Sequence, residues 1–315
     1  MKLRFKHQKF QEDAVKATCD IFTGQINSEH KFLADQGADD GTFFAQMERT
    51  GFGNADISLQ DAQLLKNLHE VQGLQNIARN SKIERLNNRP VFTIEMETGT
   101  GKTYTYIKTM YELNKQYGWC KFIVVVPSIA IREGVYKSFQ TTAEHFAEDY
   151  GKKIRFFIYN STKLNELEQF SEDPNINVMI INTQAFAASL KEGAKNKESR
   201  IIYSKRDDFA SRRPIDVIAA NRPIIIMDEP QKMEGEATQT ALKRFMPLFI
   251  LNYSATHKTK HNTVYALDAL DAYNKKLVKK IQVKGFEVKN LKGTSSYLYI
   301  DSIILSKTEP PMVKI

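Results

Sequence analysis

The sequence Thr93-Ile94-Glu95-Met96-Glu97-Thr98-Gly99-Thr100-Gly101-Lys102-Thr103 decides the fold of this chain. The apolar residues 91–94 predict a strand, and the glycines at 99 and 101 predict a tight turn. A helix is predicted from residue 102, because apolar and aromatic side chains recur at helical spacing at Tyr104, Ile107, Met110 and Tyr111. A strand, a glycine-rich turn and a helix N-terminus together form a phosphate cradle, since loop N–H groups and the helix dipole face the anion.

The side chains in this cradle indicate that it binds a nucleotide together with Mg²⁺. The Lys102 ammonium is expected to reach the terminal phosphates of a nucleotide, and the Thr103 hydroxyl is expected to bind Mg²⁺. The general pattern G-x-x-x-x-G-K-[ST] would place a glycine where this chain has Met96, so the string resembles the E-T-G-T-G-K-T form of superfamily 2 helicases and translocases. The nucleotide contacts expected from it are Gln11, Thr98, Gly99, Thr100, Gly101, Lys102 and Thr103. A glycine turn that merely precedes a lysine is the alternative.

Gln11 lies in a predicted helix over residues 7–23, upstream of the cradle. It follows Phe10 and precedes Ala14 by three residues, which resembles the adenine-reading Q motif of superfamily 2 enzymes. A glutamine amide both donates and accepts, as recognition of adenine requires. An ordinary glutamine on a helix surface is the alternative interpretation.

A pair of carboxylates follows a second apolar run. Residues 224–227 predict a buried strand, and Asp228 and Glu229 come directly after it. Ligands of open α/β sheets bind at this carboxyl edge. Asp228 is expected to hold Mg²⁺, and Glu229 to orient or deprotonate the water that attacks the γ-phosphate. An acidic pair alone could be a capped strand end, but its place in the same strand–helix series as Lys102 favours catalysis.

Polar residues at the ends of three further predicted strands are candidates for DNA contact or for coupling DNA to the phosphate site: Pro127, Ser128, Arg132, Thr183, Gln184, Ser254 and Thr256. Loops and helix N-termini at strand ends commonly contact nucleic-acid phosphates. Ser128 also fits a plain helix cap.

Composition bounds the class of protein. The chain has 315 residues, of which 42% are hydrophobic and 26% charged, as in globular proteins. Its net charge of +8 favours a polyanionic partner such as nucleic acid, although a solubilising surface bias would give the same value. Cys19 and Cys120 belong to no metal-binding pattern and suggest reduced thiols in the cytoplasm. No apolar run reaches membrane-spanning length.

The strand–helix series predicts one large domain over residues 1–260, with a helical insertion at about 28–90. Residues 261–315 are expected to begin a following region, because the pattern changes from helical spacing at 265–273 to alternation at 281–283 and 296–304. Two lysine- and arginine-rich stretches, 191–213 and 275–292, fit a nucleic-acid contact or a solvated loop equally well.

Longer stretches of the sequence resemble one particular family among the superfamily 2 enzymes. Residues 96–104, 121–135, 228–231 and 253–257 resemble the Res subunit of type III restriction enzymes, and 267–281 look like its continuation. The resemblance implies an α/β fold with a RecA-like (P-loop NTPase) parallel sheet flanked by helices, the first motor domain of a superfamily 2 helicase, with a short C-terminal β-containing extension. It also implies ATP and Mg²⁺ as cofactors, translocation on double-stranded DNA, and a modification methyltransferase subunit as partner.

The sequence departs from the full family pattern after His257. Too few residues follow for a second RecA-like domain, and neither a Gly-Arg-x-x-Arg box nor a nuclease constellation occurs. The chain is therefore expected to be an N-terminal portion that binds nucleotide and turns it over slowly, because an arginine finger accelerates related NTPases by about 10³–10⁵-fold. The alternatives are another superfamily 2 helicase acting on DNA or RNA, or a nucleotide-gated DNA-binding module without turnover.

Overall fold

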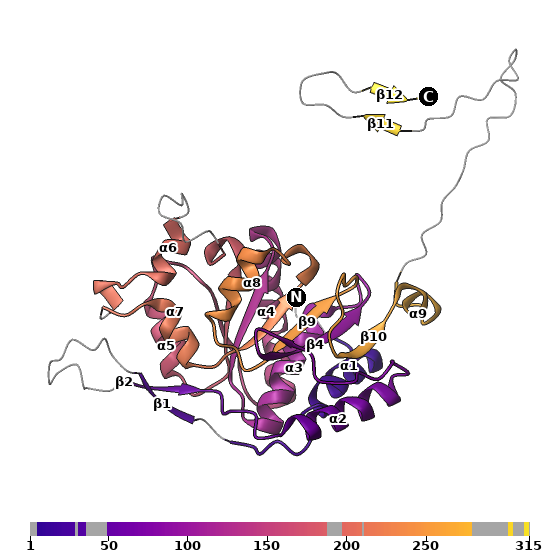
Figure 1. Ribbon diagram of the computed structural model, residues 1–315, viewed down its shortest axis with the longest axis horizontal. Helices are drawn as coiled ribbons and strands as arrows, with labels where there is room; N and C mark the ends of the chain where they lie inside the picture. The colour runs from indigo at the N-terminus through magenta and orange to yellow at the C-terminus, as the bar shows by residue number, and fades with distance from the viewer. Residues whose placement is uncertain are drawn as a thin grey trace, which may run out of the picture. The chain divides into compact units, whose positions relative to one another are not determined.

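Parallel strands form the central sheet of the computed structural model, in the order β10–β4–β9–β8–β5–β7–β6 (Figure 1). Their bounds in that order are Thr263–Leu267, Arg89–Met96, Ile250–Ser254, Ile224–Asp228, Lys121–Val126, Asn177–Asn182 and Arg155–Ile158. The short strand β3 (Arg85–Leu86) adds an antiparallel pairing to β4. The structure describes residues 5–28, 31–35, 49–187, 197–209, 211–278, 302–304 and 312–314.

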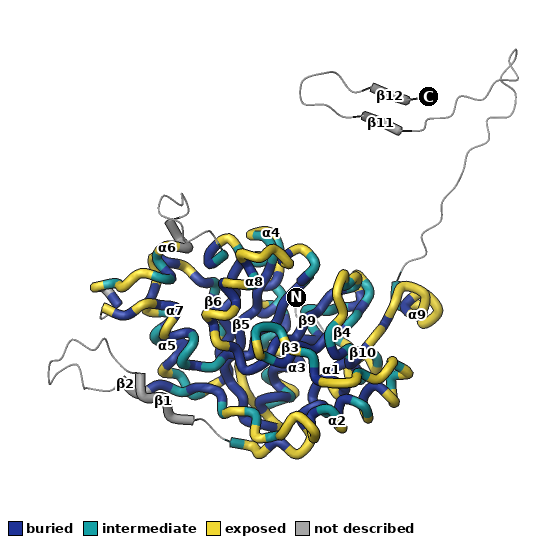
Figure 2. Tube along the Cα trace, viewed as in Figure 1, coloured by how far each residue is buried: buried dark blue, intermediate teal, exposed yellow. Residues whose placement is uncertain are grey.

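Helices cover both faces of this sheet, which buries the strands (Figure 2). Helices α1 (Lys9–Asp20), α2 (Asp61–Leu74), α3 (Lys102–Tyr117) and α4 (Ile129–Tyr150) pack on one face. Helices α5 (Asn165–Glu172), α6 (Lys197–Tyr203), α7 (Pro214–Ala220) and α8 (Glu236–Lys243) pack on the other.

The buried apolar side chains form two cores, one on each face of the sheet, and strand β5 contributes to both. Phe122 and Val124 belong to one core, whereas Ile123 and Val125 belong to the other, because successive side chains point to opposite faces. All six residues of β5 are buried, as a continuous apolar run in a parallel sheet predicts. The prediction of an α/β fold with a parallel sheet flanked by helices is confirmed.

The segment between α1 and β4 is more than the helical insertion that the sequence suggests. It contains α2, but also an antiparallel pair formed by β1 (Lys31–Asp35) and β2 (Arg49–Gly53). Asn54 fastens the end of β2 to the sheet. Its amide nitrogen donates to the carbonyls of Lys121 (2.8 Å) and Arg222 (3.0 Å), and its oxygen accepts from the Cys120 and Lys121 amides.

The sheet continues past the expected boundary at residue 260. Strand β10 pairs in parallel with β4, and the first structural unit extends to Val278. The helix expected over 265–273 is therefore wrong in its first half, where pairing with β4 outweighs local helical spacing. Helix α9 (Ala269–Asn274) occupies the second half.

The second unit, Lys279–Ile315, contains the antiparallel strands β11 (Ser302–Ile304) and β12 (Met312–Lys314). Within the alternation predicted at 296–304, residues 302–304 form a strand, while 296–301 and 281–283 lie outside the described residues. Most of the lysine-rich stretch 275–292 also lies outside them.

The loop expected over 191–213 is wrong for its described part. Helix α6 and the 3₁₀ turn η3 (Asp207–Phe209) lie there, with Ile202 and Phe209 fully packed. Arg212 is buried and pairs with Glu168 at 2.9 Å. None of the helices in the described ranges combines the length and apolarity that a membrane span requires.

Candidate nucleotide-binding site

The carboxyl ends of three neighbouring strands bring the phosphate loop and the acidic pair together. Strand β9 lies between β4 and β8, with Ser254 opposite Glu95 and Tyr253 opposite Asp228. Since all three strands are parallel, the residues that follow them meet at one edge of the sheet.

The loop after β4 has the backbone of an anion cradle. Gly99 (φ +83°) and Gly101 (φ +86°) both adopt the left-handed conformation, which glycine tolerates without strain. The Thr100 amide and hydroxyl both donate to the Glu97 carbonyl, at 3.2 and 2.6 Å. Helix α3 begins at Lys102, so its first N–H groups point out of the helix end toward the loop.

Gln11 lies beneath this loop and not on a helix surface. Its side chain is only 8% exposed, and its Nε2 donates to the Thr100 carbonyl at 2.9 Å. A Cβ atom on Gly101 would lie 2.5 Å from the same nitrogen, so a substitution there would displace the Gln11 amide as well as strain the backbone at φ +86°. Recognition of adenine by Gln11 stays a prediction.

Lys102 and Glu229 form an ion pair across the loop. The Nζ atom is 3.2 Å from Glu229 Oε1 and 3.5 Å from the Met96 carbonyl oxygen. Glu229 has a left-handed backbone (φ +60°), which a non-glycine residue adopts at a cost of about 1–3 kcal/mol. The structure therefore holds this carboxylate in place against local strain.

Two polar side chains fix the second oxygen of Glu229. Gln231 Nε2 donates to Oε2 at 2.6 Å, and Ser254 Oγ lies 2.9 Å from the same atom. Burial alone would raise the pKa of Glu229, but the hydrogen bonds from Gln231 and Ser254 and the Lys102 ammonium lower it below its usual value. The carboxylate is thus ionised and oriented at neutral pH.

Asp228 is buried beside Glu229 at the end of β8. Burial, and then the Glu229 charge, raise its pKa to about 6. Tyr106 donates to Asp228 Oδ2 at 3.3 Å and also hydrogen-bonds Thr103, so its hydroxyl joins the two residues predicted to bind metal. No pattern in the sequence points to Tyr106, because its position on α3 is ordinary and only the packing of α3 in the fold brings it to Asp228.

The residues predicted for DNA contact or coupling fall into two groups. At the ends of β5 and β7, Ser128 Oγ caps α4 by accepting from the Ile131 amide at 3.4 Å, and Arg132 donates to Asn182 Oδ1 at 3.1 Å. Pro127 precedes this cap, and Thr183 and Gln184 form the 3₁₀ turn η2 (Thr183–Ala185) directly after Asn182.

The second group, Ser254 and Thr256, lies beside Glu229 in the candidate site. Ser254 is fully buried, and its hydroxyl contacts Glu229 and accepts from the Thr256 amide at 3.1 Å. The Thr256 side chain is exposed. Ser254 therefore acts on the carboxylate directly, whereas Thr256 contributes its backbone.

A family model described as "Type III restriction enzyme, res subunit" matches residues 4–259. The chain belongs to this family. Among curated proteins it is similar to the EcoPI Res subunit of Escherichia phage P1, with 34% identity over 249 residues that cover 72% of this chain and 25% of that protein. It is also similar to the EcoP15I Res subunit of Escherichia coli, with 32% identity over 242 residues and the same two coverages. The Res-family chain thus spans about a quarter of the length of these relatives.

Solved structures with similar folds include a nuclease-deletion mutant of the Type ISP restriction-modification enzyme LlaGI in complex with a DNA substrate mimic. The likeness has 14% identity and a TM-score of 0.38, and it covers 70% of this chain and 21% of that one. The Sulfolobus solfataricus SWI2/SNF2 ATPase core in complex with dsDNA shows 12% identity and a TM-score of 0.35, covering 65% and 33%.

Asp228→Asn is expected to stabilise the fold of the Res-family chain at neutral pH. The folded-state pKa of about 6 lies above the ordinary value of 3.8, so the stability that this carboxyl contributes is complete below pH 4 and is lost as pH rises toward 6. Above that range the buried charge destabilises the fold by an amount on the order of 1–3 kcal/mol, which a neutral amide avoids.

Urea unfolding at pH 4 and pH 7.5 measures this effect. The gain from Asp228→Asn should be present at pH 7.5 and vanish at pH 4, where aspartate is itself protonated in the fold. Asp271→Asn, at an exposed position on α9, is the control and should change neither value. An equal gain at both pH values would contradict the assigned cause.

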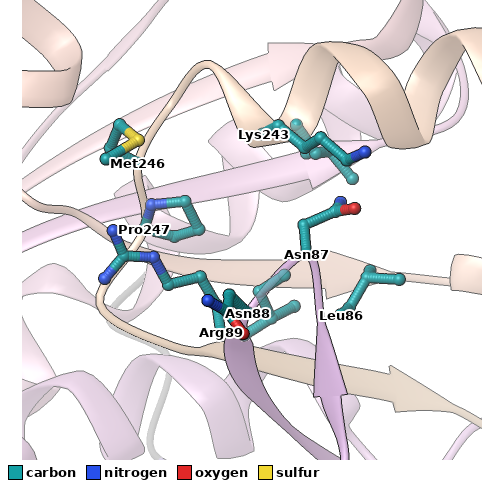
Figure 3. A pocket seen from close by; sticks show the side chains of 9 residues that line it. Leu86, Asn87, Asn88, Arg89, Lys243, Met246 and Pro247 are labelled. Carbon is teal, nitrogen blue, oxygen red and sulfur yellow. The ribbon is translucent and has the colours of Figure 1, made fainter.

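A cavity of about 570 Å³ lies at the opposite edge of the sheet (Figure 3). Its lining residues are Leu86, Asn87, Asn88, Arg89, Leu242, Lys243, Met246, Pro247 and Ile250. Arg89 and Ile250 are the first residues of β4 and β9, so this cavity is at the amino ends of the strands. It is separate from the candidate nucleotide site.

Proposed function

We propose that this chain is the ATP-binding motor lobe of a type III restriction enzyme, in which ATP hydrolysis drives movement on double-stranded DNA. The observation that carries the proposal is the group formed by Lys102, Asp228 and Glu229 at one sheet edge, next to a left-handed glycine loop and the N-terminus of α3. Each of these residues has a charge and a position suited to phosphate chemistry.

The donor set fits a nucleotide with its magnesium ion. Loop amides and Lys102 would hold the phosphates, and Thr103 and Asp228 would hold the metal. Asp228 is buried with a raised pKa, which is the condition of a carboxylate whose environment lacks sufficient positive charge. Bound Mg²⁺ would supply that charge and neutralise the charge that develops on the transferring phosphate.

The ion pair between Lys102 and Glu229 suggests how these two side chains are positioned before a nucleotide binds. A phosphate that binds the Lys102 ammonium would compete with Glu229 for it. Glu229 would then keep its contacts with Gln231 and Ser254 and present its free oxygen to the attacking water. A base in this place favours a hydrolase over a nucleotide-gated module without turnover.

The proposed domain bounds and partners rest on membership of the family. We place residues 1–278 in the first motor domain, with β10 at the edge of its sheet. Double-stranded DNA and a modification methyltransferase subunit are the partners that we propose. The cytoplasm is the location that we propose, since Cys19 and Cys120 are buried and form no disulfide.

Nucleotide and DNA binding test the proposed function. A fluorescent ATP analogue should bind the chain only weakly without Mg²⁺, and unlabelled ATP should displace it. Double-stranded DNA should bind with an affinity that falls as salt rises, and it should raise the slow rate of ATP hydrolysis. Preference for RNA over duplex DNA would favour another superfamily 2 helicase, and a complete lack of ATP binding would overturn the proposal.

A further inference from the structure

Two histidines and an aspartate lie together beside the start of α3, apart from the acidic pair. His7 precedes α1, while His145 and Asp149 are one turn apart on α4. Asp149 Oδ2 is 3.6 Å from His7 Nε2 and 3.6 Å from His145 Nε2. One nitrogen or oxygen atom of each side chain lies within 4.8 Å of the other two.

These distances are close to those of a tetrahedral metal centre. Zn²⁺ binds imidazole nitrogen and carboxylate oxygen at about 2.0–2.2 Å, which places neighbouring ligand atoms about 3.3 Å apart. Side-chain rotations that bring the three ligand atoms to this spacing would complete the site. Three protein ligands would leave a fourth position for water, and His7 is 47% exposed, so an ion can enter from solvent.

A carboxylate lies on the side of the second ring nitrogen of His7. Glu12 Oε1 is 3.9 Å from His7 Nδ1, and Lys108 holds Glu12 at 3.2 Å. A carboxylate behind the second nitrogen fixes the ring of a metal-binding histidine.

We propose that His7, His145 and Asp149 form a binding site for a divalent transition-metal ion, with Zn²⁺ as the best match. The ion would tie the segment before α1 to α4. Gln11 follows His7 by one turn and donates to the Thr100 carbonyl, so the ion would also hold α1 against the phosphate loop. Because α1 would be held against this loop, we expect the ion to change the affinity for nucleotide. That expectation rests on the proposed function, whereas metal binding itself does not.

The Tyr104 hydroxyl provides an internal test. It lies 2.8 Å from His145 Nε2, the same atom that would bind the ion. Because the hydroxyl and the ion compete for one lone pair, Tyr104→Phe should tighten Zn²⁺ binding. A cluster that serves only as a hydrogen-bonded contact would gain nothing from this change.

Zn²⁺ titration of the chelator-treated chain, against a chromophoric chelator as competitor, measures the affinity. One equivalent should bind, and Co²⁺ should give the visible absorption of a tetrahedral site. His7→Gln and His145→Gln should each weaken binding by at least about 100-fold, and Glu12→Gln by about tenfold. His69→Gln changes a histidine of α2 that contacts the Asn80 carbonyl, and should leave the affinity unchanged.

Because His7 is exposed, the His7→Gln variant should keep the fold. Circular dichroism would verify this. Excess Mg²⁺ should not displace Zn²⁺, because Mg²⁺ prefers oxygen ligands. Zn²⁺ binding that is equal in the wild type, His7→Gln and His145→Gln would overturn the proposal. So would a loss of ATP affinity in His7→Gln without any Zn²⁺ binding by the wild type, which would assign the cluster to the nucleotide site.

Discussion

Replacing Lys102 with alanine is expected to weaken ATP binding by at least about 30-fold. The ammonium is the cation of the loop, and its side chain is only 11% exposed, so its attraction for phosphate is weakly screened. Loss of one partner from a desolvated, hydrogen-bonded charge pair removes about 2 kcal/mol or more, roughly a 30-fold loss of affinity. Calorimetric titration with ATP and Mg²⁺ measures the affinity of the variant and of the wild type.

The matched control is Lys115→Ala, which removes an exposed lysine from the last turn of the same helix. This variant should bind ATP like the wild type. Lys102→Ala should unfold at a similar temperature, since Glu229 retains its hydrogen bonds to Gln231 and Ser254. Unchanged ATP affinity in a folded Lys102→Ala protein would contradict the assignment of the loop.

Glu229→Gln should separate binding from hydrolysis. The amide keeps the size of the carboxylate and still accepts a hydrogen bond, but it cannot take a proton and cannot pair with Lys102. Hydrolysis should fall by about 10²–10⁴-fold, the contribution usual for a general base. ATP should bind as tightly as to the wild type or more tightly, because Lys102 no longer has a competing carboxylate.

Single-turnover hydrolysis with excess protein and duplex DNA gives the rate, and the fluorescent analogue gives the affinity. Glu236→Gln, in the exposed first turn of α8, is the control and should change neither. A hydrolysis rate within a few fold of the wild type would show that Glu229 is not the base.

The fold was predictable from sequence wherever buried strands read as unbroken apolar runs. Strands β5 and β8 are such runs, and their parallel pairing follows from the helices between them. Strand β10 was not predictable in this way. Its residues have mixed exposure at the sheet edge, and only pairing with β4 distinguishes them from a helix.

The candidate site was predictable in its residues but not in its contacts. The motif strings point to Lys102 and Glu229, yet their separation of 3.2 Å depends on where β9 places β8 relative to β4. Gln11 was recognised from a short pattern, but its bond to the Thr100 carbonyl depends on the packing of α1. Tyr106 carries no sequence signal at all, because aromatic residues on buried helix faces are common in any core.

The order of strands in the sheet also has a consequence for synthesis of the protein. Strand β4 leaves the ribosome before any of its parallel partners, yet it pairs with β9 and β10, which are the last strands of the sheet to be made. Until residue 254 has emerged, the apolar strand β4 has no parallel neighbour on either side, and until residue 267 it has one on a single side. Such unpaired edges promote aggregation. The strands that carry the candidate nucleotide site can therefore be assembled only after β9 and β10 have been synthesised, and β4 has an exposed edge during that interval.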